Sequence, residues 1–262
     1  MITDRSRLPS IFWLLALFVI TVLVIGRGHG FRALLSLGLT FLIVVGFVVP
    51  KILDGAEPIK LVVFSSAAIV VGSMLIVYGW NKKSRVAISG MLVGVIITAV
   101  ISRIFTEFAS LTGSTVEEVM FIKDLVGNNV DFEGLLLASF ILGSLGVLDD
   151  IAITQAATTE EIVLANSKLS RGEIFKKVMR VGVDHIASMI NTLFLAYAGA
   201  SFVLLLLFGL NQPPFQGFVD VVNNEVVATE IIRTLVGSVG LILTVPITTY
   251  LAAYYYSDRT NG

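Results

Sequence analysis

Seven long hydrophobic runs follow one another along the chain, separated by short polar or glycine-containing breaks. Each run approaches the roughly 20 residues that a helix needs to cross the hydrocarbon core of a membrane, and none alternates like a half-buried strand. The pattern predicts an all-α fold, a polytopic transmembrane helix bundle of about seven spans in a single membrane domain, 1–262. The predicted spans are 8–25, 31–49, 61–80, 86–108, 134–155, 183–208 and 229–256.

Less hydrophobic stretches between the spans predict short amphipathic helices at the membrane surface. These stretches lie within 109–133, in a cytoplasmic segment 158–182, and in 215–227. A Ser or Thr followed three residues later by Glu is typical of a capping box, which marks the start of a helix. Three such pairs occur, Ser114 with Glu117, Thr158 with Glu161, and Ser170 with Glu173. We expect the last pair to begin a long helix that continues into the sixth span.

The composition agrees with a membrane environment. Hydrophobic residues make up 56% of the 262 positions and charged residues only 14%, and the mean hydropathy is +0.92. A water-soluble domain could not bury that much apolar surface, so we expect the lipid bilayer to be the main partner. The 18 Lys and Arg nearly balance the 19 Asp and Glu, which argues against binding of nucleic acid.

Basic residues gather in alternate loops, and such loops face the cytoplasm in most membrane proteins. If the loop after the first span is cytoplasmic, the inner side receives most of the Lys and Arg, including the hairpin of Lys82, Lys83 and Arg85. Arg5 and Arg7 oppose this choice. We therefore expect the N-terminus outside and the C-terminus inside.

The most informative polar feature is the pair Asp149-Asp150 within the fifth predicted span. Insertion of an aspartate at the centre of a membrane helix costs roughly 2.5 to 3.5 kcal/mol, and such acids usually face a bundle interior or a wet cavity. We therefore interpret the pair as part of an ion, proton or substrate path. The alternative is a structural role, in which the acids pair with basic residues of the next helix, namely Lys176, Lys177 or Arg180.

Helical periodicity suggests which groups accompany the pair. Asp150 and Thr154 share a face of the fifth span with two glycines, while Asp149 points about 100° away. On the sixth span, Asp184 and Asn191 lie along a polar stripe with His185 beside it. We predict that Asp149, Asp150, Thr154, Asp184, His185 and Asn191 converge on the path.

Small residues at fourfold or threefold spacing allow membrane helices to approach closely. The predicted packing positions are Gly90 and Gly94 on the fourth span, Gly143 and Gly146 on the fifth, and Gly237 and Gly240 on the seventh. Charged neighbours near the outer ends predict local ion pairs: Arg103 with Glu107, and Arg233 with Glu230 unless Arg233 is an interfacial anchor.

No catalytic motif is present, so we expect neither an enzyme nor a cofactor. The nearest candidate is the Gly-x-Gly-Asp motif of intramembrane aspartyl proteases, but the chain has Gly146-Val-Leu-Asp149, which lacks the second glycine. Serine-histidine, Walker and zincin motifs are missing. The chain has no cysteine, and too few ligands converge to predict a metal site.

Several strings in the second half of the chain resemble one bacterial family. The string from Gly143 to Ala157, followed by Asp184-His-Ile-Ala-Ser188, Asn191-Thr192 and Leu195-Ala-Tyr-Ala-Gly-Ala200, is similar to the YibE/F-like multi-pass membrane proteins. The shorter, F-type member fits best, because no large insertion follows the first span. The resemblance implies the bacterial cytoplasmic membrane as location, and an E-type family member as partner in a hetero-oligomer; a homo-oligomer is the alternative.

These observations lead to one functional hypothesis and one alternative. The hypothesis is a transporter or permease subunit whose intramembrane aspartate pair handles a proton or cation. The alternative is a structural or accessory membrane protein that assembles with a partner subunit. The substrate, direction and coupling ion do not follow from the sequence.

Overall fold

The computed structural model describes residues 7–114, 119, 121–123, 130–206, 209, 212 and 216–257. These residues form helices, and no β-strand occurs among them. The helices are α1 (Leu8–Ile43), the π-helical turn η1 (Val44–Val48), α2 (Val49–Leu53), α3 (Pro58–Tyr78), α4 (Lys82–Phe108), α6 (Phe132–Ala165), α7 (Arg171–Ala200), α8 (Phe202–Leu205), α10 (Phe218–Asn223) and α11 (Glu225–Ser257).

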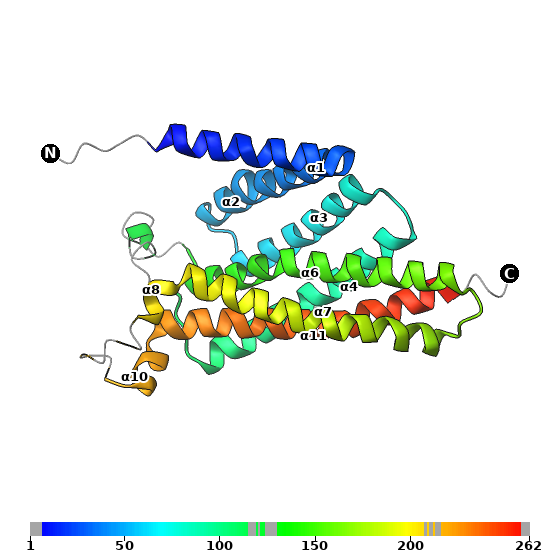
Figure 1. Cartoon of the computed structure of the whole chain (residues 1–262). Helices are drawn as coiled ribbons and strands as arrows, with labels where there is room; N and C mark the ends of the chain where they lie inside the picture. Colours follow the sequence, from blue (N-terminus) through cyan, green and yellow to red (C-terminus); the bar gives the residue numbers. More distant parts are fainter. Residues whose placement is uncertain are drawn as a thin grey trace.

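The described helices confirm the prediction of an all-α membrane bundle. Six of them are long and apolar enough to cross a membrane, and the first is a continuous 46-residue segment, Leu8–Leu53. At about 1.5 Å per residue this segment would be far too long for one crossing. It contains two arms instead, because the chain folds back on itself within α1 (Figure 1). With both arms counted, the described helices give seven apolar helical segments, the same number as the predicted spans.

The reversal in α1 occurs at Arg27, whose φ of 47° and ψ of −127° are not helical. We call residues 8–26 the first arm and residues 28–43 the second arm. Gly30 lies so close to the carbonyl oxygen of Val22 that any side chain at Gly30 would overlap it. Residues eight positions apart in a straight helix would be separated by about 12 Å. This contact therefore requires the two arms to turn back on each other.

The helical segment that contains the second arm continues past Val49, where the predicted span 31–49 ends. The turn before Pro50 widens into η1, and the segment then runs on as α2 through Leu53. Proline lacks the N–H that a regular helical turn needs, and its ring crowds the preceding turn. A local π-helical turn accommodates both effects without ending the helix.

Side chains cap the starts of α4 and α7. The Asn81 side chain accepts from the Ser84 N–H at the start of α4, directly after Gly79, whose φ of 75° ends α3. The capping box of Ser170 and Glu173 is confirmed at the start of α7. This long helix runs on into the sixth span, as predicted.

The other two predicted capping boxes have different outcomes. Thr158 does not start a helix, since α6 continues to Ala165. The reason is packing: Ile162 and Val163 lie against a cluster of buried residues from α7 and α11, which holds this part of α6 in place. The predicted segment 158–182 is therefore the tip of a helical hairpin, built from the end of α6 and the start of α7. The box of Ser114 and Glu117 lies partly outside the described residues.

The centre of the bundle is formed by α4, α6 and α11. Where α4 meets α11, a glycine on one helix faces a threonine on the other, so closely that a Cβ at the glycine would overlap the threonine side chain. Three such pairs occur: Gly90 with Thr248, Gly94 with Thr244, and Gly240 with Thr98. This is the close helix approach that small residues allow in membranes.

The turns of the bundle are sorted into two ends (Figure 1). One end holds the reversal of α1, the α3–α4 connection, the α6–α7 connection and the end of α11, while the start of α1 lies at the opposite end. We call the first of these the basic end, because it carries Lys82, Lys83 and Arg85. Successive connections between the long helices thus alternate between the two ends of the bundle (Figure 1).

Gly94→Ala is expected to destabilise the bundle, because its methyl group would meet both Thr244 and Leu148. Overpacking of this kind typically costs about 1–3 kcal/mol. Gly38→Ala is the matched control, since the space beside Gly38 is open and alanine is the better helix former by roughly 0.5–1 kcal/mol. Thermal unfolding of the two purified variants in detergent should shift in opposite directions; a shift in the same direction would contradict the packing argument.

Candidate functional site

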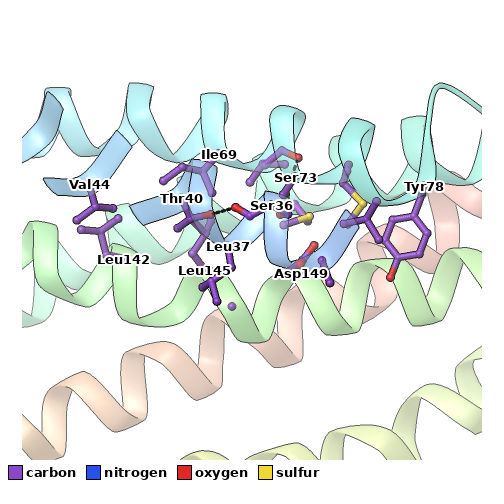
Figure 2. Close-up of a pocket in the computed structure, with 16 residues that line it drawn as sticks. Ser36, Leu37, Thr40, Val44, Ile69, Ser73, Tyr78, Leu142, Leu145 and Asp149 are labelled. Atoms are coloured by element: carbon purple, nitrogen blue, oxygen red, sulfur yellow. Dashed lines mark hydrogen bonds between the residues drawn. The ribbon is translucent and has the colours of Figure 1, made fainter. Parts of the chain in front are cut away.

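A cavity of about 480 Å³ lies between the second arm of α1, α3 and α6 (Figure 2). Its walls are mostly apolar, and its polar groups are a few hydroxyls and one carboxylate. The lining residues are Ala33, Ser36, Leu37, Thr40, Val44, Ile69, Val70, Ser73, Met74, Val77, Tyr78, Met91, Leu142, Leu145, Gly146 and Asp149.

Asp149 supplies the carboxylate. It lies near the middle of the 34-residue helix α6, and its Oδ1 atom is buried with no hydrogen-bond partner among the described residues. Burial of a polar atom without a partner costs free energy, and the cost is greater when the group is charged. The Asp149 carboxylate is therefore an unsatisfied acceptor at the wall of a cavity.

Four hydroxyl side chains share the cavity with Asp149. Thr40 donates to the carbonyl oxygen of Ser36 at 3.1 Å, as Figure 2 shows, and Ser73 donates to the carbonyl oxygen of Val70 at 3.1 Å. These two hydroxyl groups donate their hydrogen within their own helices, which leaves their oxygens as acceptors. The other two hydroxyl groups belong to Ser36 and to Tyr78, at the end of α3.

A second, more open cavity adjoins the first at the basic end, and we call it the vestibule. It is lined by His29, Gly30, Ala33, Val77, Tyr78 and Lys83. Ala33, Val77 and Tyr78 line both cavities, so these three residues form the neck between them. The vestibule thus lies between the neck and the basic end of the bundle.

Lys83 at the vestibule is held from two sides. Its Nζ atom lies 3.7 Å from the Glu160 carboxylate on α6 and 5.9 Å from the centroid of the Tyr78 ring. An ammonium group over an aromatic face is attracted to it. These contacts place a cationic group beside the neck.

Asp150 lies on a different side of α6 from the cavity. Its side chain is 56% exposed and its Oδ2 atom lies 3.6 Å from Nε2 of His185 on α7. Neither aspartate forms an ion pair with Lys176, Lys177 or Arg180 in the described part of the chain. Of the two aspartates, only Asp150 has an ionisable partner among the described residues, and that partner is His185.

The remaining predicted path residues do not join Asp149 in the cavity. Asp184 and Asn191 are exposed on the outer side of α7, and Thr154 is half-buried on α6. The predicted set thus divides into Asp149 on the cavity, the Asp150–His185 pair, and an outward polar stripe on α7. No group of three or more His, Asp or Glu that could hold a metal ion occurs within the described ranges.

The glycines of α6 and α11 that were predicted to pack against other helices differ in how close their nearest neighbour lies. A Cβ at Gly143 would lie 2.9 Å from the hydroxyl oxygen of Tyr197 on α7. Gly146 and Gly237 have open space at that position, and Gly146 lines the cavity. The absence of a side chain at Gly146 therefore adds volume to the cavity.

Two predicted ion pairs are present near the far ends of α4 and α11. Arg103 Nε lies 2.9 Å from Glu107 Oε1. Arg233 Nη2 lies 3.4 Å from Glu230 Oε1, and its guanidinium group is 5.4 Å from the centroid of the Phe140 ring. Both pairs are local and lie away from Asp149.

The hydroxyl residues of the cavity and a buried glutamine are not among the residues predicted from the sequence. Gln155 is fully buried and accepts a hydrogen bond from Thr249 of α11 at 2.9 Å. Ser36 and Thr40 follow each other at helical spacing inside an apolar span, which is a detectable signal. Nothing in the sequence indicates that these helices meet the Asp149 side of α6.

Comparison with known families gives one match, the YibE/F-like protein family, over residues 14–258. Neither curated proteins nor solved structures gave a significant match. The matched region covers nearly the whole chain and includes both arms of α1, α6 and the cavity between them. The chain therefore belongs to the YibE/F-like protein family.

Proposed function

We propose that the protein is a transporter or permease subunit of the bacterial cytoplasmic membrane, in which Asp149 takes up and releases a proton or cation. The observation that carries the proposal is the unpaired Asp149 carboxylate at the wall of a cavity within the bundle. The basic end would face the cytoplasm, which places the N-terminus outside and the C-terminus inside.

The free energy of burial supports a functional role for Asp149. An aspartate at the centre of a membrane helix costs roughly 2.5 to 3.5 kcal/mol on insertion scales. A purely structural acid would reduce this cost with a basic partner, as Glu230 does with Arg233. Asp149 has no such partner among the described residues, so a mobile ligand is the natural way to satisfy it.

The position of Asp149 also suits transport. It lies on α6, one of the three helices at the centre of the bundle, while the opposite cavity wall is the second arm of α1, which packs mainly on α3. A rigid helix on one side and a peripheral arm on the other would allow the cavity to change shape around a fixed binding group. We keep the expectation that the protein is not an enzyme.

Asp149→Asn is expected to reduce ion flux to the level of empty liposomes, because the amide keeps the shape of the side chain but cannot take up a proton or balance a cation. The measurement uses proteoliposomes that contain the full chain with any subunit that co-purifies, and an entrapped pH-sensitive or sodium-sensitive dye. Asp150→Asn is the matched control, since Asp150 lies outside the cavity, and it should retain flux. Equal flux from wild type and Asp149→Asn would reject the proposed role.

Water access to the cavity can be tested with single cysteines, because the natural chain has none. Ser73→Cys and Leu145→Cys line the cavity and should react with a membrane-impermeant thiol reagent, which needs the hydrated thiolate. Phe64→Cys should stay unreactive, since Phe64 is an outward, 75% exposed side chain on α3 that would face lipid. If the three positions reacted at equal rates, the cavity would not be a distinct water path.

The accessory function is the second candidate, and the polar surface of α7 favours it. Asp184, Ser188 and Asn191 are exposed, although polar side chains that face lipid are costly. A partner subunit would cover them, either an E-type family member, as the resemblance implies, or a second copy.

Ser188→Leu should release a co-purifying subunit if α7 is the contact, because leucine suits lipid and cannot form hydrogen bonds across helices. The measurement is the mass of the complex extracted in mild detergent. Phe64→Leu on α3 is the matched control and should leave the mass unchanged. A complex that is unaltered by Ser188→Leu would argue against this surface as the contact.

A further inference from the structure

The cavity beside Asp149 offers a metal cation only one charged ligand. Its side-chain oxygen ligands are the Asp149 carboxylate and the hydroxyls of Ser36, Thr40, Ser73 and Tyr78. Calcium sites in proteins usually contain several carboxylates in a defined geometry, and no group of three or more His, Asp or Glu that could hold a metal ion occurs among the described residues. A proton needs only one carboxylate.

The vestibule adds a second argument, from the groups that line it. An ion that entered from the basic end would pass His29, Lys83 and the neck at Tyr78. Lys83 pairs with Glu160 at 3.7 Å, so the two charges offset each other. The described lining of the vestibule contains no carboxylate for a metal cation, whereas a proton can be passed between water, imidazole and hydroxyl groups.

The titratable groups on the helices around Asp149 come from five helices. Tyr78 is on α3, Lys83 on α4, His29 in the turn of α1, and Asp150 follows Asp149 on α6. His185 of α7 contacts Asp150. No residue of α11 lines the cavity. Tyr78 is thus the one titratable group that shares the cavity with Asp149.

We infer that Asp149 is a proton site rather than a metal-cation site, and that protons reach it from the basic end through the neck at Tyr78. The inference rests on the proposed function, because it names the ion that Asp149 handles. It combines two observations, the single carboxylate of the cavity wall, and the imidazole of His29 and hydroxyl of Tyr78 that line the vestibule in front of it.

A hydrophobic carbodiimide can test the inference without a transport assay. The reagent enters the bilayer and reacts with a carboxyl group that is protonated, so a bound metal cation would protect the carboxylate. The full chain is treated in its native membranes over a range of pH, in choline, sodium, potassium or magnesium chloride. Mass spectrometry of peptides then measures the labelled fraction of Asp149.

Labelling of Asp149 is expected to fall as the pH rises and to be the same in all four salts. Asp149→Asn should lose the label, and Asp150→Asn should retain it at position 149. Protection by sodium, potassium or magnesium would overturn the proton inference while leaving the proposed function intact. Absence of label at every pH would overturn both, because no protonated carboxyl group would then be present.

The neck is tested by the rate at which a bulky impermeant thiol reagent labels Leu145→Cys. Adding Tyr78→Ala should increase this rate severalfold, because the ring that both cavities share is removed. Tyr78→Phe keeps the ring and is the matched control, so its rate should stay close to that of the parent. Equal rates for Tyr78→Ala and Tyr78→Phe would show that entry does not pass Tyr78.

Discussion

Hydrocarbon cannot solvate a polar group, and this constraint governs both the fold and the site of this protein. Backbone groups meet it by bonding within helices, which is why the apolar runs adopt no other structure. Some side chains meet it in pairs, as the Thr249 hydroxyl does with Gln155 at 2.9 Å. Several other buried side-chain atoms have no hydrogen-bond partner among the described residues, and Oδ1 of Asp149 is the one carboxylate oxygen among them.

Packing within the bundle is uneven, and the unevenness leaves room for the cavity. Glycines and threonines bring α4 and α11 into close contact, and α6 completes this tight centre. The second arm of α1 lies outside it and packs against α3, where Leu39 fits against Gly72. The arm begins at the reversal at Arg27 and ends at the π-helical turn η1. One cavity wall is therefore central, and the other is peripheral.

Much of the fold follows from the sequence because the hydrophobic effect and helix periodicity act locally. Run length predicts the seven spans, and the capping box at Ser170 predicts the start of α7. The same local signal is wrong at Thr158, where contacts of Ile162 and Val163 extend α6 past the capping pair. Pro50 fails as a stop for a comparable reason, since a π-helical turn absorbs it.

The site was harder to predict because periodicity says which residues share a face but not which neighbour that face meets. The sequence predicts that Asp150 and Thr154 lie on the glycine-containing face of α6, whereas the cavity is lined by Asp149. That side depends on where α3 and the second arm of α1 pack, a long-range outcome without a local signal. That the hydroxyl groups of Ser36 and Ser73 share a cavity with Asp149 is seen only once the positions of those helices are known.

The two adjacent acids can serve different purposes because successive helical residues point about 100° apart. Asp149 turns toward the cavity, while Asp150 lies outside it and contacts His185 of α7. Asp149 is therefore placed for the proposed proton site, and Asp150 for a contact on the α7 side. The transport and assembly proposals thus concern different sides of the same helix turn. A partner that covers α7 would shield Asp150 from lipid without closing the route past Tyr78, so the two proposals are compatible in one molecule.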